Sequence, residues 1–279
     1  MICHPTPSVS IVPRPYTYGP PMVSACNLPR MPRKIHRFVV ALIALLTALG
    51  LAVGLGQSAH AEVGAEVAAK LRVVTANVNF GNGPAKVRED IKRYRPKADV
   101  ILFQEVKNVD LKNFFNLDNW KVLQNTSSKA KAGSAVVYRK SVVSKQVNRG
   151  LHIGTRPHGK DMLTRWINWV DVKLVNGTVV RLASLHMPPA RYPGLQDNMV
   201  RNTVDFIKKS PHPVLVGGDW NFKVNNDPKN ITGKTGLKAR GKGIDGFYFA
   251  AKTVKFVNIK RLAKGNSDHH PVRMVVKVG

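Results

Sequence analysis

The sequence predicts an α/β fold over residues 62–279, in which helices flank β-sheets. The first elements alternate, because a β-branched strand at 72–77 precedes a helical period at 87–94 and a buried strand at 99–104. Strand patterns then recur to the C-terminus, with a second helical pattern between them. Such alternation is typical of sheets covered by helices. The stretch has no internal repeat and no clear internal linker, so we expect a single domain.

The first helix is expected where Val87, Ile91 and Tyr94 recur at helical spacing, and Pro96 ends it. Two further strands follow this helix in the predicted order. These two strands are predicted at 134–138 and 142–147.

A β-hairpin is predicted where the segments 165–174 and 178–185 meet at Asn176-Gly177. An Asn-Gly pair between two alternating segments is a strong signal for a two-residue hairpin. A helical pattern then covers residues 195–209 and separates this hairpin from the next strand.

The next strand is the short apolar run Pro213–Val216. Gly217 and Gly218 follow it, and they suit a tight turn and a close approach of the backbone to another group. The polar stretch 223–243, rich in Lys, Asn and Gly, is expected to be a mobile loop. Two strands complete the pattern, at 244–250 and 271–278.

The first 61 residues differ from the rest of the chain. Residues 1–30 are proline-rich and aperiodic, which indicates disorder or a start codon assigned too early. Residues 31–61 have a basic start, an uncharged apolar run and the small-x-small sequence Ala59-His60-Ala61, as signal peptides do. We therefore expect cleavage after Ala61 and secretion. The alternative is an uncleaved membrane anchor at residues 38–56 with the domain facing outside.

Residues 62–279 have a much larger net positive charge than an average domain. Five of the 44 basic residues and none of the 16 acidic ones lie in residues 1–61, which leaves the domain a net charge of +23. This excess predicts attraction to polyanions such as nucleic acid, anionic lipid head groups or cell-wall polymers. The alternative is an adaptation for solubility with no specific partner.

Both cysteines, Cys3 and Cys26, precede the predicted domain. The domain therefore has no disulfide and no thiolate for catalysis or metal binding. Any metal that it binds must use oxygen or imidazole ligands.

Polar side chains follow the predicted apolar strands. In layered α/β folds the loops at strand ends are where binding and catalytic sites are built. The residues in such positions are Asn77, Glu105, His186, Asp219 with Asn221, and Asp268 with His269. Asp219 and Asn221 are two residues apart, so on an extended segment they point to the same side. The alternative for this pair is an ordinary polar turn.

The oxygen-bearing members of this set suit a hard cation. Glu105 and Asp268 offer carboxylates, and Asn77 offers an amide oxygen. Such ligands favour Mg²⁺, or Mn²⁺ or Ca²⁺ in its place, over a closed zinc site.

The remaining members suit proton transfer and phosphate binding. His186 and His269 can act as acid, base or phosphate-binding cation, and Asp245 can hold one imidazole in orientation. Asp219 can orient or deprotonate a water, and Asn221 can stabilise a phosphoryl oxygen. Together with a divalent cation, these groups fit in-line attack of water on a phosphorus ester.

Six short motifs in this order resemble those of the endonuclease/exonuclease/phosphatase family. They are Val73–Asn77, Phe103–Val106, Ser184–His186, Gly218–Asn221, Ile244–Phe247 and Ser267–Val272. Each is weak alone, but six in family order between Leu71 and Val278 make a specific match. The resemblance implies a four-layer sandwich, with two mixed β-sheets packed face to face and helices on the outside. It also implies a metal-dependent phosphodiesterase or phosphatase.

By resemblance, Asn77, Glu105 and Asp268 contact the metal or its waters. Asp219 and Asn221 act on the nucleophile and the phosphate.

By the same resemblance, Asp245 positions His269, which acts in proton transfer or on the scissile phosphate. His186 corresponds to a histidine of the family's secreted deoxyribonucleases and sphingomyelinases, where the abasic-site repair enzymes usually have asparagine. Arg165 heads a strand where family members often carry a phosphate-contacting arginine, and Lys107 is a second candidate for that contact. The alternative for both is an exposed cation.

The chain also departs from the family pattern. Deoxyribonucleases of this type usually supply an acidic partner for the strand-end histidine from the segment before a middle strand. Here that segment, 129–134, contains no acid, so the group that orients His186 is left open. The disulfides of the animal secreted nucleases are absent too.

These observations predict a secreted, divalent-metal-dependent nuclease that hydrolyses DNA, and RNA as a further substrate, by in-line attack of water. We expect a monomer with a nucleic-acid substrate and no protein partner. The first alternative is a sphingomyelinase-like lipid or small-molecule phosphodiesterase, for which Phe114-Phe115 is the candidate membrane-docking element. The second is an inactive protein that only binds polyanions.

Overall fold

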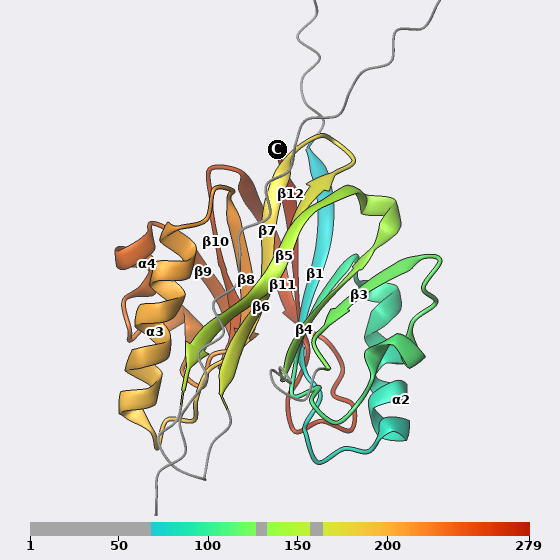
Figure 1. Cartoon of the computed structure of the whole chain (residues 1–279), viewed down its shortest axis with the longest axis horizontal. Helices are drawn as coiled ribbons and strands as arrows, with labels where there is room; N and C mark the ends of the chain where they lie inside the picture. Colours follow the sequence, from blue (N-terminus) through green and yellow to red (C-terminus); the bar gives the residue numbers. More distant parts are fainter. Residues whose placement is uncertain (1–67, 127–132, 157–163) are drawn as a thin grey trace, which may run out of the picture. The chain divides into compact units, whose positions relative to one another are not determined.

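The computed structural model describes residues 68–126, 133–156 and 164–279, which all lie in one compact unit, Glu62–Gly279 (Figure 1). The expected leader, its cleavage site after Ala61 and the alternative anchor lie outside the described residues and stay predictions. Within the described residues, no helix is both long enough and apolar enough to span a membrane.

Across the described ranges, twelve strands form two six-stranded sheets. Sheet A has the order β11-β12-β1-β2-β4-β3 and comprises β1 (Ala69–Asn77), β2 (Val100–Gln104), β3 (Trp120–Gln124), β4 (Ser134–Arg139), β11 (Val254–Arg261) and β12 (Val272–Val278). Sheet B has the order β5-β6-β7-β8-β10-β9 and comprises β5 (Val143–Thr155), β6 (Arg165–Leu174), β7 (Val179–His186), β8 (Val214–Asp219), β9 (Lys238–Lys242) and β10 (Asp245–Phe249). Short 3-10 turns lie at Arg95–Lys97, Leu111–Phe114, Lys140–Val142 and Val224–Asn226.

Each sheet is mixed. The pairs β1–β2 and β7–β8 are parallel, and the other neighbouring strands are antiparallel. The inner faces of the two sheets share one apolar cluster, in which Leu71 and Leu102 of sheet A meet Leu182 and Phe247 of sheet B. Burying each such side chain contributes about 1.5–3 kcal/mol, so this cluster holds the two sheets together.

Helices cover the two outer faces (Figure 1). Helix α2 (Pro84–Tyr94) packs its apolar stripe on sheet A, whereas α3 (Pro193–Lys208) and α4 (Ile231–Thr235) contribute to the cluster outside sheet B. The four-layer sandwich, with mixed sheets face to face and helices outside, is therefore confirmed. The predicted β6–β7 hairpin is also confirmed, but its loop has three residues, 175–177, because the Leu174 N–H donates to the Thr178 carbonyl oxygen at 2.8 Å. Gly177 takes the positive φ of 92° that this turn requires.

The prediction of a mobile loop at 223–243 is wrong, because this stretch contains α4 and β9. The Asp227 carboxylate accepts hydrogen bonds from the backbone N–H groups of Ile231 and Thr232, at 2.9 and 2.8 Å, and so caps the start of α4. Strand β9 then pairs with β10. Tertiary pairing and a local cap outweigh the polar composition.

The predicted turn at Gly217 and Gly218 is also wrong, because both glycines lie inside β8. Their role is close packing. A Cβ atom at position 217 would lie 2.7 Å from a methyl of Leu102 in the opposite sheet, and one at 218 would lie 2.3 Å from the Leu185 carbonyl oxygen on β7. The chain turns after Asp219 instead.

Candidate active site

The strand register brings three predicted site residues of sheet B side by side. His186 ends β7 and pairs with Asp219, which ends β8. Asp219 in turn pairs with Asp245, the first residue of β10. In sheet A, Asn77 ends β1 next to the end of β2, and Glu105 follows β2 directly. The site therefore forms where the ends of both sheets meet.

Buried polar contacts join the two sheets just below this site. Gln104 Nε2 donates to Ser184 Oγ at 3.0 Å, and Ser184 Oγ donates to the Phe103 carbonyl oxygen at 2.7 Å. Asn77 Nδ2 donates both to Glu105 Oε1, at 2.9 Å, and to Asp219 Oδ2, at 3.1 Å. Hydrogen bonds between buried groups are directional, so they fix the relative position of the two strand ends.

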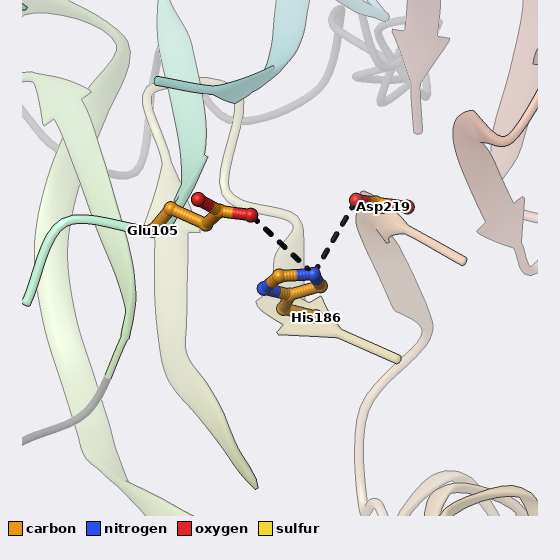
Figure 2. A group of neighbouring side chains, drawn as sticks. All are labelled: Glu105, His186 and Asp219. Carbon is orange, nitrogen blue, oxygen red and sulfur yellow. Dashed lines mark ion pairs between the residues drawn. The ribbon is translucent and has the colours of Figure 1, made fainter. Parts of the chain in front are cut away.

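His186 lies between two carboxylates (Figure 2). Its Nε2 is 3.8 Å from Glu105 Oε1 and 3.4 Å from Asp219 Oδ2. Glu105 adopts a left-handed backbone with φ of 61°, and its Oε2 accepts a hydrogen bond from the Phe80 N–H at 2.6 Å. Such a conformation is costly for a non-glycine residue and is common at functional sites.

His269 and Asp245 form a hydrogen-bonded pair on the other side of Asp219. His269 Nδ1 lies 2.9 Å from Asp245 Oδ2, and its Nε2 lies 3.6 Å from Asp219 Oδ2. Burial lowers the pKa of His269, but the hydrogen bond to Asp245 and the nearby carboxylates outweigh it and raise the pKa to about 9. His269 is therefore an imidazolium at neutral pH.

Asp219 itself is buried and lies between both imidazoles. Burial, followed by repulsion from Asp245, raises its pKa to about 6, although His269 and two hydrogen bonds act in the opposite direction. This carboxyl group is largely ionised at pH 7, yet it binds a proton more readily than an exposed aspartate does.

The partner of His186, which the sequence left open, is Arg165. Nη1 of Arg165 lies 2.7 Å from His186 Nδ1. A guanidinium is only a donor, so Nδ1 accepts and the ring proton sits on Nε2, which faces the carboxylates. Burial, then the positive charges of Arg165 and His269, hold the pKa of His186 well below its usual value. His186 is therefore a neutral imidazole.

Comparison with known proteins identifies the family. The model of the endonuclease/exonuclease/phosphatase family matches residues 74–269. The chain belongs to this family. No curated protein sequence matches it.

Solved structures of the endonuclease/exonuclease/phosphatase family share the fold. A family protein from Bacteroides thetaiotaomicron is 16% identical with a TM-score of 0.57, and the match covers 76% of this chain and 96% of that one. The human Nocturnin catalytic domain, solved with a bound sulfate anion, is 13% identical with a TM-score of 0.58 over 75% and 95%. A mannosyl-6-phosphatase from B. thetaiotaomicron is 17% identical with a TM-score of 0.52 over 74% and 99%.

Members of the endonuclease/exonuclease/phosphatase family typically use divalent metals, and this site has suitable groups. Ligand atoms of Glu105, His186 and Asp219 all lie within 4.8 Å of one another, and so do those of Asp219, Asp245 and His269. Asp245 Oδ1 is buried without a hydrogen-bond partner in the described residues. These carboxylate oxygens fit a hard cation, with Glu105 and Asp219 as the groups that would hold it.

The other predicted metal ligands lie close by in different contacts. Asn77 turns its Nδ2 toward the carboxylates, and its Oδ1 accepts a hydrogen bond from the Asn79 N–H at 3.0 Å. Asp268 Oδ1 accepts a hydrogen bond from Asn79 Nδ2 at 3.0 Å. Asp268 is therefore linked to Asn77 through Asn79, which lies in the loop after β1.

Asn221 does not have the extended conformation that its spacing from Asp219 predicted, and the phosphate contact of Lys107 stays a prediction. Asn221 has a φ of 51°, so it is not extended, and its Nδ2 donates to the Met187 carbonyl oxygen at 2.8 Å. Its N–H donates to Asp219 Oδ1 at 2.9 Å, which helps to orient that carboxylate. Lys107 is half-buried, and its side chain has no hydrogen bond or ion pair within the described part of the chain.

A residue that the sequence analysis missed is Asp90 on α2. It is fully buried and accepts hydrogen bonds from the N–H groups of Asn266, at 2.8 Å, and Ser267, at 3.3 Å. Ser267 Oγ then donates to the Asn77 carbonyl oxygen at 2.7 Å and accepts from the His269 N–H at 3.1 Å. A carboxylate on the apolar stripe of the predicted first helix indicates a buried acid that needs a partner, but it does not indicate which partner.

Proposed function

We propose that this chain is a secreted, divalent-metal-dependent phosphodiesterase that hydrolyses nucleic acid, with DNA as the main substrate. The observation that carries the proposal is the ionised Asp219 between one charged and one neutral imidazole. The Asp219 carboxylate can accept a proton from water, and the two imidazoles can donate hydrogen bonds to phosphoryl oxygens. This arrangement suits the attack of water on a phosphate ester, in which negative charge develops on those oxygens.

The side chains divide the reaction between them. Asp219 accepts a proton from the attacking water, because its carboxylate lies at the centre of the site between the two imidazoles. As the new oxygen–phosphorus bond forms and the ester oxygen–phosphorus bond breaks, His269 supplies a charged Nε2–H donor to the oxygens that gain charge. His186 supplies a neutral Nε2–H donor, which Arg165 keeps in position.

Glu105 and Asp219 would hold a divalent cation, which would supply a Lewis acid for the phosphoryl oxygen. Glu105 is ready for this contact, since its backbone and one carboxylate oxygen are already fixed. Asn77 orients both carboxylates toward the same point.

The choice of nucleic acid rests on charge. The domain carries +23, and phosphate contacts supply most of the affinity of proteins for nucleic acid without regard to sequence. The fold alone does not identify the substrate, because one of the solved structures that share this fold is a mannosyl-6-phosphatase.

The test is a plasmid-nicking assay with residues 62–279, with Mg²⁺, Mn²⁺ or Ca²⁺ and with EDTA. We expect metal-dependent nicking that disappears in EDTA and in the His269→Ala variant. Absence of cleavage of both DNA and RNA with every cation would contradict the proposal. Secretion is tested separately, because the exported protein is expected to begin at Glu62.

The lipid-hydrolase alternative loses its candidate docking element. Phe114 and Phe115 are only 8% and 6% exposed, and Phe115 packs against Trp120 with ring centroids 5.2 Å apart. These rings belong to the apolar layer under α2 and do not reach a membrane. Release of phosphocholine from sphingomyelin vesicles, with DNA left intact, would restore that alternative. Unchanged function in Asp219→Ala would favour an inactive polyanion binder.

A further inference from the structure

Strands β9 and β11 are the edge strands of the two sheets, and they lie next to each other. The Arg240 guanidinium on β9 is 5.1 Å from the centre of the Phe256 ring on β11. Arg261 Nη2 on β11 donates to the Lys242 carbonyl oxygen on β9 at 3.4 Å. The two edges therefore form one continuous surface.

Basic residues occupy every second position of β9, so their side chains point to the same side of this surface. Lys238, Arg240 and Lys242 are exposed, whereas Ala239 packs against the apolar cluster outside sheet B. Arg261 is exposed beside them. We call the set Lys238, Arg240, Lys242 and Arg261 the basic edge.

The basic edge has no acidic counterpart nearby in the sequence. Residues 228–267 contain ten lysines and arginines, and their one acid is Asp245, which is buried in the site. Within the described residues, no ion pair joins the basic edge to a carboxylate. A solvated charged face is usually of mixed sign, so this one is a candidate for binding a polyanion.

The basic edge begins at the catalytic centre. Lys242 pairs in the sheet with Asp245, the partner of His269, and Arg261 pairs with Val272 a few residues after His269. Lys242, Lys260 and Arg261 also line an open depression of about 500 Å³. A substrate whose phosphate lies at Asp219 can therefore continue onto this edge.

The spacing favours a linear polymer. Alternate residues of a strand recur about every 6.6 Å, so the β9 cations form a line that leads away from the site. A lipid surface would require a protruding apolar tip, whereas the exposed Phe256 and Val257 lie within strand β11 and the Phe256 ring is partly covered by Arg240. Strands of nucleic acid are bound along such positive tracks through their backbones.

We propose that the basic edge binds the sugar-phosphate backbone of a nucleic-acid strand on one side of the phosphate that is cleaved. The inference rests on the proposed function, because it assigns the substrate of the same site. It makes the enzyme selective for polymers over short phosphodiesters.

The first experiment measures binding in EDTA, where no cleavage occurs. Residues 62–279 are titrated against fluorescent 30-nucleotide and 6-nucleotide DNA at several salt concentrations. The triple variant Lys238→Gln, Arg240→Gln, Lys242→Gln is expected to bind the 30-mer roughly tenfold more weakly, with a log–log salt slope smaller by about 2. The loss for the 6-mer is expected to be smaller.

The matched control removes the same charge from the opposite side of the two sheets, at the edge strands β3 and β5 and at β6, the neighbour of β5. Lys121 on β3, Lys145 on β5 and Lys173 on β6 are exposed, and the control variant changes all three to Gln. Its affinity is expected to stay within about twofold of wild type, because no continuous track is removed. Equal weakening in both triple variants, or none in either, would overturn the proposal.

The second experiment locates the strand directly. The domain has no cysteine, so Lys238→Cys and Lys145→Cys each carry a photo-cross-linker at one place. We expect cross-links to DNA from position 238 and few from position 145; the reverse would overturn the proposal. Lost binding to phosphatidylserine vesicles, with oligonucleotide affinity unchanged, would also overturn it. A protein that binds DNA by this edge but never cleaves it would contradict the proposed function alone.

Discussion

His186 and His269 approach the same carboxylate oxygen from two sides, yet their chemistry is opposite. Both place Nε2 within 3.6 Å of Asp219 Oδ2. Behind His269 is the carboxylate of Asp245, and behind His186 is the guanidinium of Arg165. The first pairing raises a pKa to about 9, and the second contributes to lowering one. The Asp245 carboxylate thus helps to outweigh the effect of burial on the pKa of His269, whereas the Arg165 guanidinium adds to the effect of burial on the pKa of His186.

The largest expected effect comes from the carboxylate that both histidines share. Asp219→Asn keeps the shape but removes the proton acceptor, so kcat should fall by about 10³-fold or more. Steady-state kinetics on a phosphodiester substrate measure this. Asp118→Asn, an exposed change of the same kind, is the control and should leave kcat unchanged. A kcat within tenfold of wild type in Asp219→Asn would remove the base from the mechanism.

The next effect separates the two histidines. His269→Gln removes a charged donor and should lower kcat by about 10²- to 10³-fold, whereas His186→Gln removes a neutral one and should cost about tenfold. Nitrogen-15 NMR of the metal-free protein should find His269 doubly protonated at pH 7.5 and His186 protonated only on Nε2. Two histidines with the same protonation state would contradict the comparison.

Stability as a function of pH gives a third test, in the metal-free protein. The pKa of His269 rises from 6.5 to about 9 on folding, so its stabilisation is complete below pH 6.5 and is lost as the pH rises through 9. The slope is at most about 1.4 kcal/mol per pH unit and is reduced by solvent that reaches the ring. Urea unfolding of wild type and His269→Gln between pH 7 and 9 measures it, and the variant should lose the slope.

Below pH 6.5 the pKa shifts of Asp219 and His186 change the free energy of unfolding with pH in opposite directions. The raised pKa of Asp219 makes stability fall as the pH rises from 3.8 through about 6. The lowered pKa of His186 makes stability rise with pH up to 6.5. Asp219→Asn removes only the first contribution, so its stability should rise more steeply over this range than that of wild type.

A smaller effect comes from the group behind His186. Arg165→Gln should raise the pKa of His186 toward its usual value and lower kcat/KM about tenfold, because the ring loses its donor. Arg165→Lys keeps the charge and should recover part of the activity. An unchanged His186 titration in Arg165→Gln would show that burial alone sets its protonation.

The smallest effect concerns the support of His269. Asp90→Asn weakens the hydrogen bonds to Asn266 and Ser267 without changing the shape, so kcat should fall about threefold and stability by about 1–2 kcal/mol. The NMR signals of His269 should shift, whereas those of His186 should not. A shift of both rings would mean that α2 supports the whole site.

The fold was largely predictable because apolar periodicity marks buried strands and helices whatever their partners are. The segments from β1 to β2, the β6–β7 hairpin and the strand before Gly217 all carried that signal. The stretch 223–243 did not, because β9 is an edge strand whose exposed residues are basic. Edge strands are often charged, which hides them from a search for apolar runs.

The sequence could predict that the residues of the site gather at one end of the sheets, because polar residues follow the apolar strands in order along the chain; their roles in a reaction stay predictions. Their contacts could not be predicted. The pairing of Arg165 with His186 spans two neighbouring strands of sheet B, and the pairing of Asp90 with Ser267 spans 177 positions. Register and packing decide such contacts, and a single sequence holds no direct signal for either.

The two glycines of β8 have a consequence for where Asp219 can lie. A Cβ atom at position 217 would collide with the Leu102 and Phe247 side chains, and one at 218 with the Leu185 carbonyl oxygen on the neighbouring strand. Any larger residue at either position would therefore displace the end of β8, and Asp219 is the last residue of that strand. Side chains as small as a methyl group, introduced two residues before Asp219, would move its carboxylate relative to both imidazoles.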